Sequence, residues 1–123
     1  FNGGIIMAYF GKNAIAAWVS FDQYNNNVHS SYNIASTADN GTGEHTFTFS
    51  TAMGNSTYCW TGTASTAGGT ESSPRNVGFA SGSSSVSYNA HTSASTRVRV
   101  DVNNSNSPHD CRFLMIQWTT VNN

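Results

Sequence analysis

The strongest constraint on this sequence is the two-residue period of its apolar side chains. Residues 96–102 (TRVRVDV) alternate valine with charged side chains, and residues 45–50 (HTFTFS) alternate phenylalanine with polar ones. Successive side chains of an extended strand point to opposite faces of a sheet, so this period favours half-buried β-strands. A helical pattern is confined to residues 12–18, where alanines favour helix, and that segment runs directly into a strand-like Trp-Val-Ser-Phe sequence. The sequence therefore predicts an all-β chain.

Turn-forming residues separate the alternating segments. The Asn40-Gly41 step is a strong hairpin signal when alternating residues flank it, and we expect the turn at residues 39–43. Short strands with such turns and no helices between them indicate an antiparallel sandwich or barrel, and we expect a β-sandwich of about six to eight strands at residues 16–123. Residues 1–15 form an N-terminal segment or linker in this interpretation. The expected strands are residues 16–22, 28–34, 45–50, 57–65, 76–80, 85–88, 96–102 and 111–120.

The polar residues are mostly uncharged. Charged residues make up 9% of the chain, against about a quarter in ordinary globular domains. Ser, Thr and Asn take their place, with 47 of the 123 residues, and the formal net charge is −1. Such a chain offers no basic field for a phosphate backbone, and it contains no apolar run of the ~18 residues that a membrane-spanning helix needs. We therefore expect no nucleic-acid partner and no membrane insertion.

No pattern of catalytic, cofactor-binding or metal-ligating residues is visible. The serines form no Gly-x-Ser-x-Gly elbow, and the carboxylates fall mostly at expected turns and strand ends, where solvated acids are common. The histidines are scattered, so surface histidines are expected in place of a metal site. We expect no enzymatic activity, no cofactor and no metal. The residues in question are His29, His45, His91, His109, Asp22, Asp39, Glu44, Glu71, Asp101 and Asp110.

The cysteines and tryptophans are expected inside the fold. Cys59 and Cys111 are too few for a disulfide framework, so they either pair across the sheet or are both buried thiols, and we favour buried thiols. Trp18, Trp60 and Trp118 all fall in expected strands, which favours core packing.

A recognition surface is expected where aromatic and amide side chains meet at strand ends. A sugar-binding site needs an exposed aromatic face beside amide or acid groups, and loops on a rigid sandwich are where recognition varies. The candidate surface-recognition residues are Tyr24, Asn25, Asn26, Asn27, Tyr88 and Asn89.

Several segments together resemble a known group of proteins. Residues 17–22 (AWVSFD) and the following residues 28–36, then residues 39–53 (DNGTGEHTFTFSTAM), are similar to a recurring domain of bacteriophage tail and virion proteins. That domain has an AWVNF-like strand followed by a SYNVSSITDNGTGDYTVNFTTAM-like run. Residues 58–65 and 96–100 continue the similarity, which covers roughly residues 17–120 and departs in the loops at residues 25–27, 66–73 and 103–108.

The resemblance implies a phage structural domain, often at the end of a tail fibre, where trimers are common. No catalytic residue is associated with the pattern. The first hypothesis is a receptor-binding tip module on the virion surface that touches a host glycan or protein. The second is a capsid decoration, cement or head-fibre protein that binds other virion proteins, and a tailspike-like glycan hydrolase is a minor third. One lysine and two prolines leave the sheet edges with few blocking residues, which favours self-association, most simply a homotrimer assembled in the bacterial cytoplasm.

Overall fold

The computed structural model describes residues 15–65, 75–79, 91–102 and 107–119 of the chain. Over these residues the secondary structure consists of strands and turns without a helix, which confirms the expected all-β class. The strand that we expected at residues 85–88 and the segment at residues 1–14 lie outside the described residues. The strands are β1 Ile15–Asp22, β2 Asn27–Tyr32, β3 Ile34–Gly41, β4 Glu44–Phe49, β5 Trp60–Ala64, β6 Arg75–Phe79, β7 Ser95–Val102 and β8 Leu114–Thr119.

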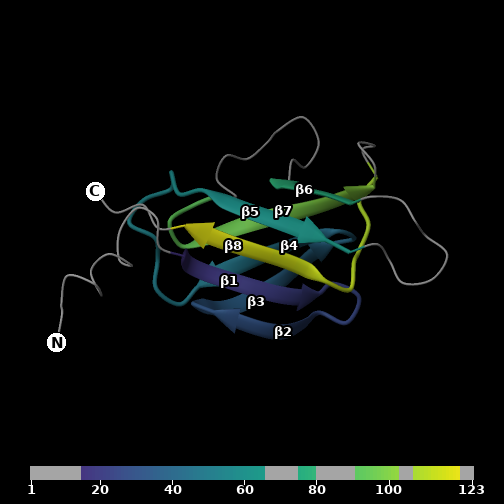
Figure 1. Ribbon diagram of the computed structural model, residues 1–123, viewed down its shortest axis with the longest axis horizontal. Helices are drawn as coiled ribbons and strands as arrows, with labels where there is room; N and C mark the ends of the chain where they lie inside the picture. Colours follow the sequence, from purple (N-terminus) through teal and green to yellow (C-terminus); the bar gives the residue numbers. More distant parts are fainter. Residues whose placement is uncertain (1–14, 66–74, 80–90, 103–106, 120–123) are drawn as a thin grey trace.

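The strands form two four-stranded antiparallel sheets. One sheet has the order β2-β1-β8-β5 and the other the order β3-β4-β7-β6. In Figure 1 the two sheets lie one behind the other, with β8 between β1 and β5 in the same layer. The fold is a β-sandwich, as expected from the sequence.

Aromatic side chains from both sheets meet in the core. The ring centroids of Phe21 and Phe47 lie 5.4 Å apart, and those of Phe49 and Trp118 lie 5.3 Å apart, in both cases edge to face. Edge-to-face pairs add about 0.5–1.5 kcal/mol each beyond the burial of their area. Trp118 is fully buried, as expected, whereas Trp60 is only partly buried and packs against the edge of the core. The buried apolar residues are Ala17, Val19, Phe21, Phe47, Phe49, Met53, Tyr58, Val98, Val100, Cys111, Leu114, Ile116 and Trp118.

A single residue carries the chain from one sheet to the other. We expected one strand at residues 28–34, and this is wrong, because Asn33 has a φ of 59° and separates β2 from β3. Its side-chain amide donates to the carbonyls of Ala16 (3.1 Å) and Thr51 (3.0 Å), and its side-chain oxygen accepts from the Thr51 N–H (2.7 Å). Asparagine tolerates the left-handed conformation because its short polar side chain can bond locally. The edge strands β2 and β3 therefore follow each other without a loop.

The expected hairpin at residues 39–43 is present, but its turn is shorter. β3 continues to Gly41 and pairs with β4, which leaves the turn to Thr42 and Gly43. Gly43 has a φ of 73°, and its carbonyl accepts from the N–H of Val100 at 2.9 Å. Its own N–H donates to a carboxylate oxygen of Asp110 at 2.7 Å. The turn is thereby tied to β7 and to the segment that leads into β8.

Candidate functional site

The outer face of the β2-β1-β8-β5 sheet exposes large apolar side chains. Trp18 on β1 lies opposite Tyr32 on β2 and opposite Gln117 on β8, and Ser20 lies opposite Met115. Residues directly opposite each other in an antiparallel pair point to the same face, so all five side chains point away from the core. The exposed fractions are 38% for Trp18, 57% for Tyr32 and 49% for Met115. We expected Trp18 in the core, and this is wrong, because the inward positions of β1 belong to Ala17, Val19 and Phe21.

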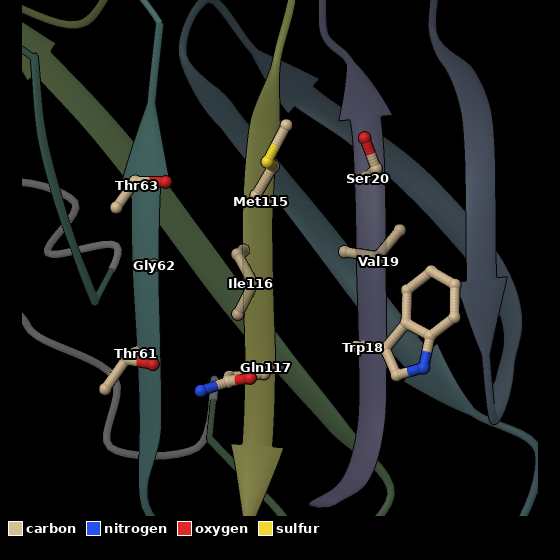
Figure 2. A pocket seen from close by; sticks show the side chains of 9 residues that line it. All are labelled: Trp18, Val19, Ser20, Thr61, Gly62, Thr63, Met115, Ile116 and Gln117. Atoms are coloured by element: carbon tan, nitrogen blue, oxygen red, sulfur yellow. The ribbon is translucent and has the colours of Figure 1, made fainter.

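A shallow groove of about 470 Å³ runs over the middle of this face. It crosses three neighbouring strands, β5, β8 and β1. Because neighbouring strands lie about 4.8 Å apart, the groove is about 10 Å wide. Figure 2 shows the side chain of Gln117 directed toward Thr61, while the indole of Trp18 is turned away from Gln117. Thr63 and Met115 lie opposite each other on the next outward-facing row. The groove is lined by Trp18, Val19, Ser20, Thr61, Gly62, Thr63, Met115, Ile116 and Gln117.

Every described residue that lines the groove is uncharged, in contrast to the outer face of the other sheet. There, Arg97 donates through Nε to Glu44 at 2.9 Å, and Arg99 donates through Nε to both oxygens of Asp101 at 2.9 and 3.0 Å. Glu44 also lies 3.5 Å from a guanidinium nitrogen of Arg99. The two faces therefore differ in chemistry: one carries a network of ion pairs, and the other carries aromatic rings, a thioether, an amide and hydroxyls.

The candidate residues at the turn between β1 and β2 are held by structural hydrogen bonds. Asp22 accepts from the backbone N–H of Tyr24 (2.9 Å) and from the side chain of Asn25 (2.7 Å). Burial raises the pKa of Asp22, but the hydrogen bonds from Asn25 and Tyr24 outweigh burial and leave this pKa below its usual value. Asn26, with a φ of 50°, bonds through its side chain to His45 and Asp39.

Of the expected recognition residues, the turn therefore leaves Tyr24 and Asn27. The Tyr24 ring is exposed, with the guanidinium carbon of Arg112 at 5.4 Å from its centroid. Asn27 is exposed and begins β2 opposite Asp22. Tyr88 and Asn89 lie outside the described residues. Because Asn25 and Asn26 stabilise the turn, this surface has fewer free amides than the sequence suggested.

A polar cluster lies inside the sandwich, at the end where β1 and β4 meet the segment before β8. Gln23, His45 and Cys111 are all buried there, and Gln23 bonds to both of the others. We expected surface histidines, and for His45 this is wrong, since its exposed fraction is 1%. Burial lowers the pKa of His45, although the carboxylates of Asp39 and Asp110 oppose this effect.

The thiol of Cys111 and the hydroxyl of Thr96 lie near buried polar groups and are not available to a solute. Both cysteines are free; Cys111 is buried as expected, and burial raises the pKa of its thiol to about 12, but Cys59 is exposed, contrary to expectation. The hydroxyl of Thr96 lies 3.3 Å from Nδ1 of His91, yet Thr96 is fully buried. Neither Cys111 nor Thr96 can reach a substrate in this arrangement. Within the described parts of the chain, no three His, Cys, Asp or Glu side chains lie close enough together to hold a metal ion.

Sequence reasoning missed the groove although the relevant signal is in the sequence. In residues 17–21 (AWVSF), Val19 and Phe21 fix the inward positions, so Trp18 must point outward. The same alternation in residues 114–118 (LMIQW) places Met115 and Gln117 outward. What the sequence does not contain is the order of the strands, which brings β5, β8 and β1 side by side.

The fold and the groove define a β-sandwich with one outer face on which the described groove residues are uncharged and aromatic side chains are exposed. No protein-family model matches the chain, and no curated protein and no solved structure matches it. Among the described residues there is no helix long and apolar enough to span a membrane.

Proposed function

We propose that this chain is a non-enzymatic structural protein of a phage virion, most simply a tail-fibre or receptor-binding tip module that attaches the particle to the host surface. The observation that carries the proposal is the outer face of the β2-β1-β8-β5 sheet, where Trp18, Tyr32 and Met115 are exposed beside the groove. The resemblance of residues 17–120 to phage tail and virion domains supports the same assignment.

The exposed aromatic residues are difficult to explain without a ligand. Trp and Tyr are the residues that most often dominate binding energy, because each buries a large rigid surface and also has a polar atom. Contiguous apolar patches on soluble proteins commonly mark interaction sites. Trp18 and Tyr32 are direct neighbours across β1 and β2, so together they form one platform and not two isolated exposed rings.

The groove fits a glycan hydrolase less well, but it does not separate a tip module from a capsid decoration protein. A glycan hydrolase needs a pair of carboxylic acids flanking the bond that it cleaves, and among the residues that the structure describes no carboxylate lines the groove. A capsid decoration protein would use the same face against the capsid lattice. It remains the second candidate, and the location of the chain on the virion distinguishes it from a tip module.

We also propose that the module is a homo-oligomer, most simply a trimer. Among the strands of the described residues, β2 and β3 are both edge strands, all six residues of β2 are exposed, and neither strand contains lysine or proline. Unpaired strand edges without such blocking residues tend to associate with other chains. An oligomer at micromolar concentration is expected in sedimentation experiments, and a stable monomer would contradict this part of the proposal.

Labelling of the virion tests the proposed function directly. Gold-labelled antibody against this chain should decorate the distal end of the tail, and the purified chain should compete with virions for adsorption to host cells. Label on the head shell, together with a loss of capsid heat resistance when the chain is removed, would replace the tip module with the decoration protein.

A further inference from the structure

We infer that the groove over β5, β8 and β1 binds an uncharged glycan of the host surface. This inference rests on the proposed attachment function and names the chemistry of its ligand. It depends on three properties of the groove: the absence of charge, the hydrogen-bonding groups along its floor and the aromatic platform at its β2 side.

The absence of charge selects the class of ligand. An acidic polysaccharide, a phosphate or a basic peptide would lose water on entering the groove, and none of the described lining residues has an opposite charge to compensate for this loss. A neutral sugar has no such cost beyond that of its hydroxyls. On the outer face of the other sheet, Arg97 and Arg99 are paired with Glu44 and Asp101.

The polar groups of the groove match the hydroxyls of a sugar. Gln117 offers an amide donor and an amide acceptor, and the hydroxyls of Ser20, Thr61 and Thr63 can each donate and accept. None of these four side chains makes a hydrogen bond to another of the described residues, so they are free to bond a ligand. Gln117 lies in the middle strand of the three, opposite Thr61 on one side and Trp18 on the other.

The aromatic platform supplies the apolar part of the interaction. The π face of an indole or phenol ring carries partial negative charge, which attracts the weakly positive C–H groups on one face of a pyranose ring. Trp18 lines the groove, and Tyr32 lies next to it, so a glycan that follows the groove from β5 to β1 passes from amide and hydroxyl groups onto aromatic rings. The volume of about 470 Å³ lies within the usual range of about 300–1,000 Å³ for small-ligand sites.

The experiment measures binding of the purified chain to polysaccharides extracted from the host, both neutral and acidic, by calorimetry and by tryptophan fluorescence. We expect binding to the neutral polysaccharide with a blue shift of the emission, because Trp18 is exposed whereas Trp118 is already buried. Trp18→Ala should weaken binding by about tenfold or more, and Gln117→Ala by several-fold. Phe113→Ala is the matched control, because Phe113 is an exposed aromatic residue outside the groove, and its replacement should leave the affinity unchanged.

Both groove variants replace exposed side chains, and their urea midpoints should equal that of the parent chain, which separates a binding defect from a folding defect. Intact host cells provide the second arm. Periodate oxidises glycans, and protease removes surface proteins. The inference is supported if periodate treatment of the cells destroys binding and protease treatment leaves it intact. Binding that protease destroys and periodate leaves intact overturns the glycan while the attachment function stands.

Two further results would overturn the inference itself. Binding confined to acidic polysaccharide would contradict the argument from charge, and loss of binding in Tyr24→Ala with full binding in Trp18→Ala would place the site at the β1–β2 turn. If the chain binds no host cells and does not compete with virions, the proposed function fails, and the assignment of a host glycan fails with it.

Discussion

The side-chain amide of Gln23 donates to Nδ1 of His45 at 3.2 Å inside the sandwich. The direction of this bond follows from the other end of the same amide, where the oxygen accepts from the backbone N–H of Cys111 (2.9 Å) and from its thiol (3.1 Å). His45 therefore carries its proton on Nε2, which donates to the side-chain oxygen of Asn26 at 2.7 Å. This chain of bonds connects β4, the β1–β2 turn and the segment before β8, and it requires a neutral imidazole.

The first prediction is that acid weakens the fold through His45. A proton on Nδ1 would face the N–H of Gln23, and burial holds the pKa of His45 below its usual 6.5 in the folded state. The unfolded chain thus binds more protons than the folded chain below about pH 6.5. The free energy of unfolding should be highest above that pH and fall as the pH decreases toward about 5, as urea midpoints will measure.

The matched variants for this prediction are His45→Gln and His91→Gln. Burial also lowers the pKa of His91, so each histidine should contribute to the loss of stability in acid. In each variant the free energy of unfolding should therefore depend less steeply on pH. The lowered pKa values of Asp22 and Asp39 act only in more acidic solution, because they lie below 3.8. If the free energy of unfolding of His45→Gln falls between pH 6.5 and about 5 as steeply as that of the parent chain, then protonation of His45 does not destabilise the fold.

The second prediction concerns Asn33. Asn33→Ala should lower the free energy of unfolding by about 3 kcal/mol, because it removes three side-chain hydrogen bonds and places an alanine in the left-handed region. Asn33→Gly should cost about 1–2 kcal/mol, because glycine adopts this conformation freely and only the hydrogen bonds are lost. Chemical denaturation measures both. If both variants lose the same free energy of unfolding, the left-handed backbone conformation at position 33 does not affect stability.

Asn33 also illustrates what the sequence could not predict about the fold. The alternation of residues 45–50 and 96–102 is local, and it correctly predicted β4 and β7. By contrast, residues 28–41 contain few apolar side chains, and buried and exposed positions do not alternate along them. The break at Asn33 depends on Ala16 and Thr51, which are distant in the sequence, so no local pattern marks it.

The groove could be predicted only in part, for a related reason. The inward positions of β1 and β8 determine that Trp18 and Gln117 point outward, and this follows from the sequence alone. That Thr61 joins them depends on the pairing of β5 with β8, a contact between residues more than fifty positions apart. The sequence also did not show that the amides of Asn25 and Asn26 bond Asp22, His45 and Asp39, because such partners are visible only in three dimensions.

The third prediction concerns Gly43. A Cβ atom at this position would lie 2.7 Å from the Val100 carbonyl oxygen and 2.8 Å from the His109 backbone nitrogen, and the φ of 73° is unfavourable for alanine. Gly43→Ala should therefore lower the free energy of unfolding by about 3 kcal/mol. Gly78→Ala is the control, because no atom of the described residues, its own chain neighbours apart, lies within 4 Å of its added Cβ, and its effect should stay within about 1 kcal/mol. Similar urea midpoints for the two variants would refute the steric argument.

The fourth prediction is that the two free thiols react at very different rates. Cys59 is exposed and should react with a disulfide reagent in the native protein. Cys111 is fully buried, its thiol donates to Gln23, and its pKa of about 12 leaves almost no thiolate at neutral pH. One thiol per chain should therefore react under native conditions and two in denaturant, with Cys59→Ser abolishing the native reaction. If native Cys59→Ser still reacts with the reagent, the reacting thiol is Cys111, and the segment before β8 must open readily. That result would contradict the burial of Cys111 with Gln23 and His45.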